Sequence, residues 1–338
     1  MINFHYERAS SITDAIGRMA ADPGAKFIAG GTNLLDLMKE HVERPSQLID
    51  ISHLPLKRVE QTADGGVRIG ALVPNTDLAY HPLIEARYPI LSSALLAGAS
   101  QQLRNMASVG GNLMQRTRCS YFYDTATPCN KREPNSGCSA IGGHNRGHAI
   151  LGASESCIAT HPSDMCVALA ALDARVLLAG PSGERSMPIS DFHRLPGDEP
   201  HRDNNLGPAE IITAVELPPR GFAAHFSYLK IRDRLSYAFA LVSVAAALEM
   251  EGATIKEARL ALGGVAHKPW RNADAEAALC GPAADGASFA RAAEALLRGA
   301  RGHAHNAFKI ELARRAIVRT LMQAVRGTPQ SQSNKKIA

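Results

Sequence analysis

The sequence lacks a long apolar run. Its longest apolar stretch, residues 239–248, is interrupted by Ser243, whereas a membrane-spanning helix needs about 18 consecutive apolar residues. The first residues, MINFHYERASS, contain neither an apolar segment nor a twin arginine, so we expect the chain to carry no export signal of its own. These absences argue against an integral membrane protein.

The common signatures of nucleotide-binding and hydrolytic proteins are also missing. The sequence contains no G-x-G-x-x-G fingerprint, no Walker lysine loop and no H-E-x-x-H motif. Residues 152–156 have the serine of a nucleophile elbow but not its closing glycine. The net charge of +5 is too small to predict nucleic-acid binding. Hydrolase chemistry and nucleic-acid recognition therefore have no specific support.

The composition is otherwise that of an ordinary globular protein. The chain has 338 residues, of which 45% are apolar and 20% are charged, so we expect two or three domains with a sizeable core. Cysteine is the exception, because a chain with such a core needs no disulfide staples. The pattern favours a metal or redox centre first and disulfides second. The cysteines are Cys119, Cys129, Cys138, Cys157, Cys166 and Cys280.

Hydrophobic periodicity organises most of the chain but not residues 113–161. Residues 1–50 indicate a strand–helix–strand unit, in which Ile2, Phe4 and Tyr6 alternate as in a half-buried strand. The irregular segment is too long for an unstructured loop in a compact domain, and its cysteines favour a functional role. The remaining patterns predict helices at 83–98, 165–172, 272–280, 288–297 and 305–325, and strands at 226–231, 238–248 and 255–262.

Two glycine pairs are candidate ligand contacts. Gly30 and Gly31 precede Thr32 and Asn33 between an expected strand and an expected helix. Glycines allow a close backbone approach, and a helix start presents free N–H groups, so this turn could cradle a phosphate. Residues 109–112, Val-Gly-Gly-Asn, repeat the pattern. Taken alone, either pair is better interpreted as an ordinary tight turn, and Asp50, at the distance of a ribose-binding acid, lacks the accompanying glycine fingerprint.

Four cysteines give the spacing C-x9-C-x8-C-x18-C. This is neither the C-x2-C pairing of zinc ribbons nor the compact ferredoxin run. Four thiolates suit an iron–sulfur cluster or zinc, and free or disulfide-bonded cysteines are the alternative. Cys166 and Cys280 are interpreted as small buried hydrophobes, and His144, His148 and His161 as loop histidines. Cations that lower thiol pKa values lie between the cysteines, at Arg116, Arg118, Lys131, Arg132 and Arg146.

In this order, the motifs resemble the FAD-binding medium subunit of the molybdenum hydroxylases, the family of xanthine dehydrogenase and aldehyde oxidase. The similar strings span 26–35, 107–112, 161–164 and 210–218, together with Lys230, and the likeness covers roughly residues 1–325. The cysteine segment is an insertion that resembles two subgroups, the flavin subunits of bacterial periplasmic aldehyde oxidoreductase and of 4-hydroxybenzoyl-CoA reductase. The strings at 116–124, 128–132, 157–164, 232–241 and 263–270 look most similar to the first.

The resemblance implies an α+β protein, with a two-subdomain FAD-binding fold of the vanillyl-alcohol-oxidase type followed by a C-terminal α+β domain. The implied divisions are 1–55, 56–218 with the insertion 113–161, 219–325, and a flexible tail 326–338. No residue of this chain is implied to be catalytic. The implied FAD contacts are Lys26, Phe27, Ile28, Ala29, Gly30, Gly31, Thr32, Asn33, Leu34, Ser108, Gly111, Asn112, Asp164, Ile212 and Lys230. The implied ligands of a 4Fe–4S cluster are Cys119, Cys129, Cys138 and Cys157.

The resemblance also implies a division of labour among subunits. A large subunit with the molybdenum cofactor would oxidise an aldehyde to a carboxylate, and a small 2Fe–2S subunit would pass electrons to FAD on this chain. Such a heterotrimer would be periplasmic by co-export with a signal-bearing partner, whereas the sequence alone suggests the cytoplasm. Three alternatives remain: a 4-hydroxybenzoyl-CoA reductase subunit, a zinc-binding interaction protein without catalytic activity, and a stand-alone flavin oxidase.

Overall fold

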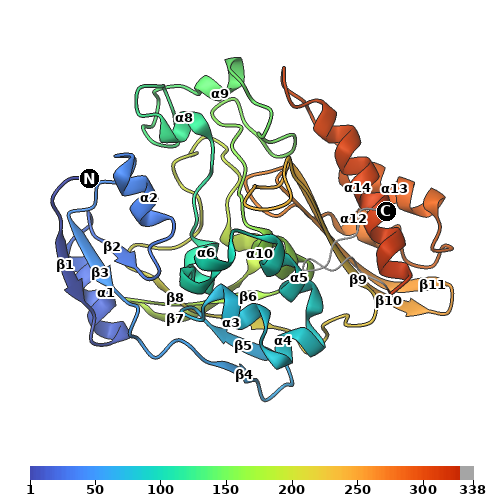
Figure 1. The fold of residues 1–338 in the computed structure, drawn as a ribbon, viewed down its shortest axis with the longest axis horizontal. Helices are drawn as coiled ribbons and strands as arrows, with labels where there is room; N and C mark the ends of the chain where they lie inside the picture. Colours follow the sequence, from blue (N-terminus) through green and yellow to red (C-terminus); the bar gives the residue numbers. More distant parts are fainter. Residues whose placement is uncertain (328–338) are drawn as a thin grey trace.

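The computed structural model describes residues 1–327, and most of the predicted flexible tail, residues 328–338, lies outside the described residues. Three sheets succeed one another along the chain, from the blue N-terminal part to the red C-terminal part (Figure 1). No helix in the described range is long and apolar enough to cross a membrane. The observed mixture of helices with parallel and antiparallel sheets confirms the predicted α+β class.

The first sheet has three parallel strands in the order β1-β3-β2. Ser11 caps the first helix by accepting a hydrogen bond from the Asp14 N–H, as its sequence predicts. The alternation of Ile2, Phe4 and Tyr6 predicts a strand here, but β1 begins only at His5 and the predicted half-burial is wrong. All four residues of β1, an edge strand, are exposed. The elements are β1 (His5–Arg8), α1 (Ile12–Ala21), β2 (Lys26–Ile28), α2 (Leu34–Lys39) and β3 (Gln47–Asp50).

Asp50 at the end of β3 stabilises this sheet rather than facing a ligand. Its Oδ2 accepts hydrogen bonds from the Tyr6 hydroxyl at 2.6 Å and from Arg8 Nε at 3.2 Å. Its Oδ1 accepts from the Ser52 N–H at 2.8 Å. Burial by itself raises the pKa of Asp50, but these hydrogen bonds outweigh it and lower the pKa to about 2. The carboxylate is thus committed to its own subdomain.

The second sheet has five antiparallel strands in the order β4-β5-β8-β6-β7, with helices packed over one large core. The predicted helix at 83–98 is two helices, since Pro89 cannot donate a hydrogen bond and disfavours helical geometry at Tyr88. The elements are β4 (Val59–Gln61), β5 (Val67–Gly70), α3 (Asn75–Ala79), α4 (Pro82–Arg87), α5 (Pro89–Ala97), α6 (Gln101–Met106), α7 (Val109–Leu113), α10 (Asp164–Ala171), β6 (Arg175–Gly180), β7 (Gly183–Pro188), α11 (Ile189–Phe192) and β8 (Ile211–Leu217).

The third sheet is antiparallel in the order β11-β10-β9, and α14 packs against β9 and β10. A separate hydrophobic core joins its apolar face to the three C-terminal helices. The strand predicted from residue 238 begins at Val242, because residues 238–241 belong to the connection from β9. The elements are β9 (Phe226–Ile231), β10 (Val242–Glu251), β11 (Thr254–Gly263), α12 (Ala273–Ala277), α13 (Gly286–Leu296) and α14 (Phe308–Val325).

The cysteine segment 113–161 has only two helices of one turn each, α8 (Ser120–Tyr123) and α9 (Ser139–Gly142). Both lie at the upper edge of the view in Figure 1, away from the three sheets. Side chains from distant elements fix this segment. Lys309 of α14 donates to the carbonyl oxygen of His148 at 2.7 Å, and Arg116 donates to Glu43 and Asp203, each at 2.6 Å. Polar contacts thus order the segment together with a small apolar cluster in which Phe122 and Cys129 pack against Leu37.

Candidate functional site

A cavity of 410 Å³ lies where the first and second sheets approach each other. Every residue from 26 to 34 lines it, and the second sheet contributes Ile212 at the edge of β8. Ser108 and Gly111 of the second glycine turn complete this part of the wall. The structure thus brings together residues that the resemblance assigned to one ligand, although they come from three distant segments.

The turn at residues 31–34 presents free backbone donors to this cavity. Gly31 has a φ of +70°, the left-handed geometry that favours glycine, and this geometry directs the chain from β2 into α2. Within residues 1–327, the N–H groups of these four residues find no hydrogen-bond acceptor. Such a row of free N–H groups suits an anionic group such as a pyrophosphate.

The two glycines of this turn have different tasks. A side chain on Gly30 would overlap the carbonyl oxygen of Met106, so backbone packing also requires glycine at this position. A Cβ on Gly31 would lie 2.8 Å from Leu35 Cδ1. Both glycines line the cavity, and their predicted contact with a ligand stays a prediction.

A second cavity, of 670 Å³, continues on the other side of the same turn. It shares Thr32, Asn33 and Gly111 with the first cavity, so the two form one elongated groove. Asn112, Asp164 and aromatic residues of the β9–β10 connection line the far part. The two cavities together are called the groove below.

Several buried polar atoms along the groove have no hydrogen-bond partner within the described chain. They are Asn33 Nδ2, Asn75 Oδ1, Arg104 Nε and Arg118 Nε. Unpaired polar atoms cost about 1–3 kcal/mol each when buried, so this set suits a polar ligand that would pair with them. The backbone N–H of Arg116 donates to Asn33 Oδ1 at 2.9 Å, which leaves the amide nitrogen of Asn33 toward the cavities.

Asp164 lies at the far end of the groove, and Lys230 lies beside Asp164 but does not border the groove. Asp164 lines the second cavity, whereas Lys230 lines neither part of the groove. Lys230 Nζ donates to Asp164 Oδ2 at 2.7 Å and to the Ala97 carbonyl oxygen at 3.1 Å. The structure therefore places Lys230 behind Asp164, and its predicted contact with FAD stays a prediction.

The four cysteines of the segment converge in space and none forms a disulfide. Cys129 and Cys138 face each other across an antiparallel bridge. Burial raises the pKa of Cys119 to about 12 and that of Cys157 to about 11, and each thiol also feels two of the other cysteines electrostatically. Buried neutral thiols of this kind exchange their protons for a metal when one binds.

The distances between the four cysteine sulfur atoms can be compared with those of a zinc site. Four sulfurs at about 2.3 Å from one zinc ion would lie about 3.8 Å apart. In the part of the chain that the structure describes, no three of the four Sγ atoms lie within 4.8 Å of one another. As described, the four side chains therefore do not form a closed zinc site.

His148 is the residue near the cysteines whose role the sequence did not specify. Its Nε2 lies 3.1 Å from Cys119 Sγ, and its Nδ1 is buried without a partner in residues 1–327. Burial, followed by the charge of Lys309, lowers the pKa of His148 to about 4, so the ring is neutral at pH 7. The prediction that His148 is a hydrogen-bonding loop histidine is consistent with its observed position. The sequence could not predict its contact with Cys119, because that contact depends on how the segment folds.

Comparisons with known proteins agree with this site. Residues 2–220 match the model of the FAD binding domain in molybdopterin dehydrogenase, and residues 226–324 match the CO dehydrogenase flavoprotein C-terminal domain. The chain is 53% identical over 322 residues to the aldehyde oxidoreductase FAD-binding subunit PaoB of Escherichia coli (strain K12), covering 95% of this chain and 98% of that protein.

Solved structures give the same result. A chain of quinoline 2-oxidoreductase from Pseudomonas putida 86 is 27% identical, with a TM-score of 0.74 over 96% of this chain and 98% of that chain. A chain of carbon monoxide dehydrogenase from Hydrogenophaga pseudoflava is 25% identical, with a TM-score of 0.76 over 97% of this chain and 100% of that chain. The resemblance inferred from the motifs is confirmed: the chain belongs to the FAD-binding medium subunits of the molybdenum hydroxylase family.

Proposed function

We propose that this chain is the FAD- and 4Fe–4S-containing subunit of a molybdenum aldehyde oxidoreductase. The observation that carries the proposal is the 53% identity to an aldehyde oxidoreductase FAD-binding subunit over nearly the full length of both chains. The groove and the converging cysteines support it independently. This chain alone would not oxidise aldehydes, since its part is to bind and orient redox groups.

The groove fits FAD. The free N–H groups of residues 31–34 would hold the pyrophosphate, with Ser108 and Gly111 on the opposite wall. Asn112 and Asp164 would meet the polar groups farther along, and Ile212 would supply an apolar wall. When bound, FAD supplies the ability to accept electrons singly and to release them in pairs. The protein supplies a rigid groove with polar partners already in place.

For the cysteine segment we propose a 4Fe–4S cluster and not a single zinc ion, on the family resemblance and on the four free cysteines gathered there. Cys119, Cys129, Cys138 and Cys157 would hold the cluster, which when bound supplies a one-electron carrier. Burial raises the pKa of Cys157 to about 11, and the charge of Lys131, held by Asp203 Oδ1 at 2.5 Å, only partly offsets this. The cations of the segment would offset the negative charge of a thiolate-ligated cluster.

The remaining parts of the proposal come from the family resemblance. We propose a heterotrimer in which a large subunit carries the molybdenum cofactor and a small subunit carries a 2Fe–2S cluster that delivers electrons to this chain. We also propose that the complex is periplasmic, by co-export with a signal-bearing partner. Separation of periplasm from cytoplasm after co-expression with the partner subunits tests the location, and enzyme found only in the cytoplasm would contradict it.

The decisive experiment is anaerobic purification with the co-expressed partners, followed by flavin, iron and sulfide assays on the separated subunit. We expect one FAD, with about four irons and four sulfides, as in a four-cysteine cluster. Flavin without iron would leave the family assignment intact but reject the cluster. Turnover of the complex with aldehydes, and not with an aromatic CoA thioester, would separate the proposal from a CoA-thioester reductase.

A further inference from the structure

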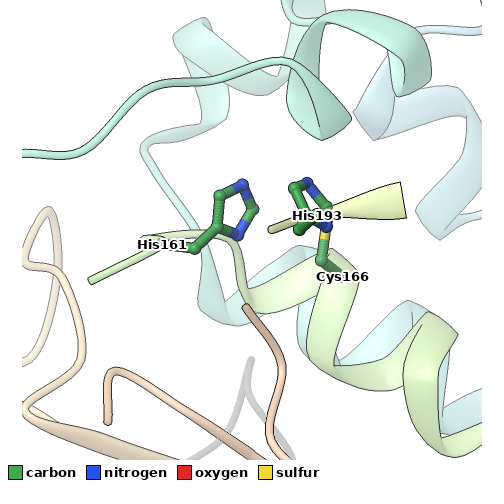
Figure 2. Close-up of side chains that lie close together, drawn as sticks. All are labelled: His161, Cys166 and His193. Carbon is green, nitrogen blue, oxygen red and sulfur yellow. The ribbon is translucent and has the colours of Figure 1, made fainter. Parts of the chain in front are cut away.

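Three buried side chains that neither line the groove nor belong to the four clustered cysteines meet near the start of α10. His161 lies three residues before α10, Cys166 is in its first turn, and His193 follows α11 (Figure 2). One ligand atom from each lies within 4.8 Å of those of the other two. Cys166 is fully buried, and the two histidines are 5% and 3% exposed. Distant segments thus place two imidazoles and a thiol in one enclosed position.

The hydrogen bonds of these rings are incomplete in a way that points to a ligand. His193 Nε2 lies 2.9 Å from the Leu113 carbonyl oxygen, which accepts its proton and leaves a lone pair on Nδ1. That Nδ1 has no partner in residues 1–327, and neither nitrogen of His161 has one. A histidine that donates one N–H to a backbone carbonyl and keeps its other nitrogen unpaired beside a group of ligand atoms has the arrangement of a metal-ligating histidine.

The Cys166 side chain is positioned by the start of α10, where Ser163 also interacts with the thiol. Ser163 caps α10 by accepting the Cys166 backbone N–H at 3.0 Å, so the helix itself directs the side chain to the histidines. The ring centroids of His161 and His193 are 4.1 Å apart. The donors therefore converge from fixed backbone, as a preformed metal site requires.

We propose that His161, Cys166 and His193 bind one borderline-soft metal ion, Cu(I) or Zn(II). Two imidazoles and one thiolate are the donor set of trigonal copper sites and are also common zinc ligands. Binding releases the thiol proton to solvent, and the metal–sulfur bond replaces the S–H bond. With Cu(I), the assembled site has no net charge, which reduces the cost of burying it.

The site would link three parts of the second subdomain. It would join the start of α10 to the segment after α11 and, through the Leu113 carbonyl, to the end of α7. Asp164 and Asn112, both on the groove, lie next to these anchors. The ion would thus have a structural role beside the flavin groove, separate from the proposed iron–sulfur cluster.

The test is metal analysis of the full chain purified with its partner subunits. After incubation with one equivalent of Zn(II) or Cu(I) and removal of free metal, we expect one zinc or copper ion per copy of this chain. Cys166→Ala should reduce this occupancy at least tenfold without loss of flavin or iron. Cys280→Ala is the matched control, because Cys280 lies on another element and should leave zinc and copper unchanged.

A second variant guards against misfolding of the first. His193→Gln keeps an amide donor for the Leu113 carbonyl but removes the imidazole nitrogen. It should lose the metal, together with the thiolate–metal absorption of a Co(II)-loaded sample, while it retains FAD. If the protein retains metal only in the sample incubated with Cu(I), or only in the sample incubated with Zn(II), that result identifies the ion. A wild-type chain that takes up neither metal, or a Cys166→Ala chain that binds either one normally, would overturn the proposal.

Discussion

The ammonium of Lys230 on β9 lies 2.7 Å from the Asp164 carboxylate at the start of α10, and both side chains are buried. The Tyr228 hydroxyl donates to the other oxygen of this carboxylate at 2.7 Å. Two residues that the family resemblance assigns to FAD therefore bind each other across the boundary between the second and third sheets. This ion pair fixes the carboxylate that lines the groove.

Breaking this ion pair should destabilise the protein strongly. Lys230→Met leaves the Asp164 carboxylate buried without its cation, and the loss of one partner from such a pair costs about 3–5 kcal/mol. The free energy of unfolding, measured with urea, should fall by this amount. Lys256→Met is the control, since Lys256 is exposed and its ion pair with Glu249 spans 3.5 Å. Equal stability of the two variants would show that Asp164 does not depend on Lys230.

Gly31→Val should abolish FAD retention. A β-branched residue is strained at a φ of +70°, and its Cβ would crowd Leu35. The row of free N–H groups at residues 31–34 would be displaced as a result. The measurement is the flavin-to-protein ratio after gel filtration. Gly17→Val, where a Cβ meets no atom within 4 Å, should retain a normal ratio; normal flavin in Gly31→Val would reject the phosphate cradle.

Cys138→Ser should lose iron and loosen the segment 113–161. This segment has little apolar core, so a bound cluster would supply much of its stability. Iron analysis and limited proteolysis measure the two effects, and we expect new cleavage sites within the segment. Cys280→Ser should leave the iron content and the protease resistance unchanged, because Cys280 lies in the C-terminal domain, where it pairs with Ile255. Unchanged iron content and protease resistance in Cys138→Ser would exclude this cysteine as a ligand.

His148→Phe should lower the reduction potential of the proposed cluster. The neutral ring contacts Cys119 Sγ through Nε2, and hydrogen bonds to ligand sulfurs tune cluster potentials. Phenylalanine keeps a planar ring but has no donor. A redox titration followed by electron paramagnetic resonance gives the midpoint potential. His144→Phe, at an exposed position of the same segment, should leave the potential unchanged; a shift of the same size there would assign the effect to general disturbance of the loop.

Tyr6→Phe should produce a pH-dependent loss of stability of about 1 kcal/mol, the typical value of a hydrogen bond. The pKa of Asp50, about 2, is below its ordinary value of 3.8, so its stabilising contribution is complete above pH 3.8 and is lost as the pH falls toward 2. The difference between variant and wild type should therefore be full at pH 7 and smaller at pH 3. Tyr80→Phe, at an exposed tyrosine, should show no such change. A difference that is equal at both pH values would contradict the link to Asp50.

The sequence predicted best the features that depend on neighbouring residues. The turn from Gly30 to Asn33 and the capping of α1 by Ser11 were visible because backbone geometry and helix caps are set within a few positions. Local signals also misled where packing intervened. The alternation of Ile2, Phe4 and Tyr6 suggested a half-buried strand, but all four residues of β1 are exposed.

Tertiary structure decided how distant segments meet. The sequence by itself determined the family, the glycine turns and the set of cysteines. These features are residue types at fixed positions in the chain, so they can be recognised without the fold. Only the fold placed Lys230 behind Asp164, His148 against Cys119, and His193 beside His161 and Cys166. These contacts join residues far apart in the chain, and their positions depend on packing and burial, which no local pattern of residues specifies.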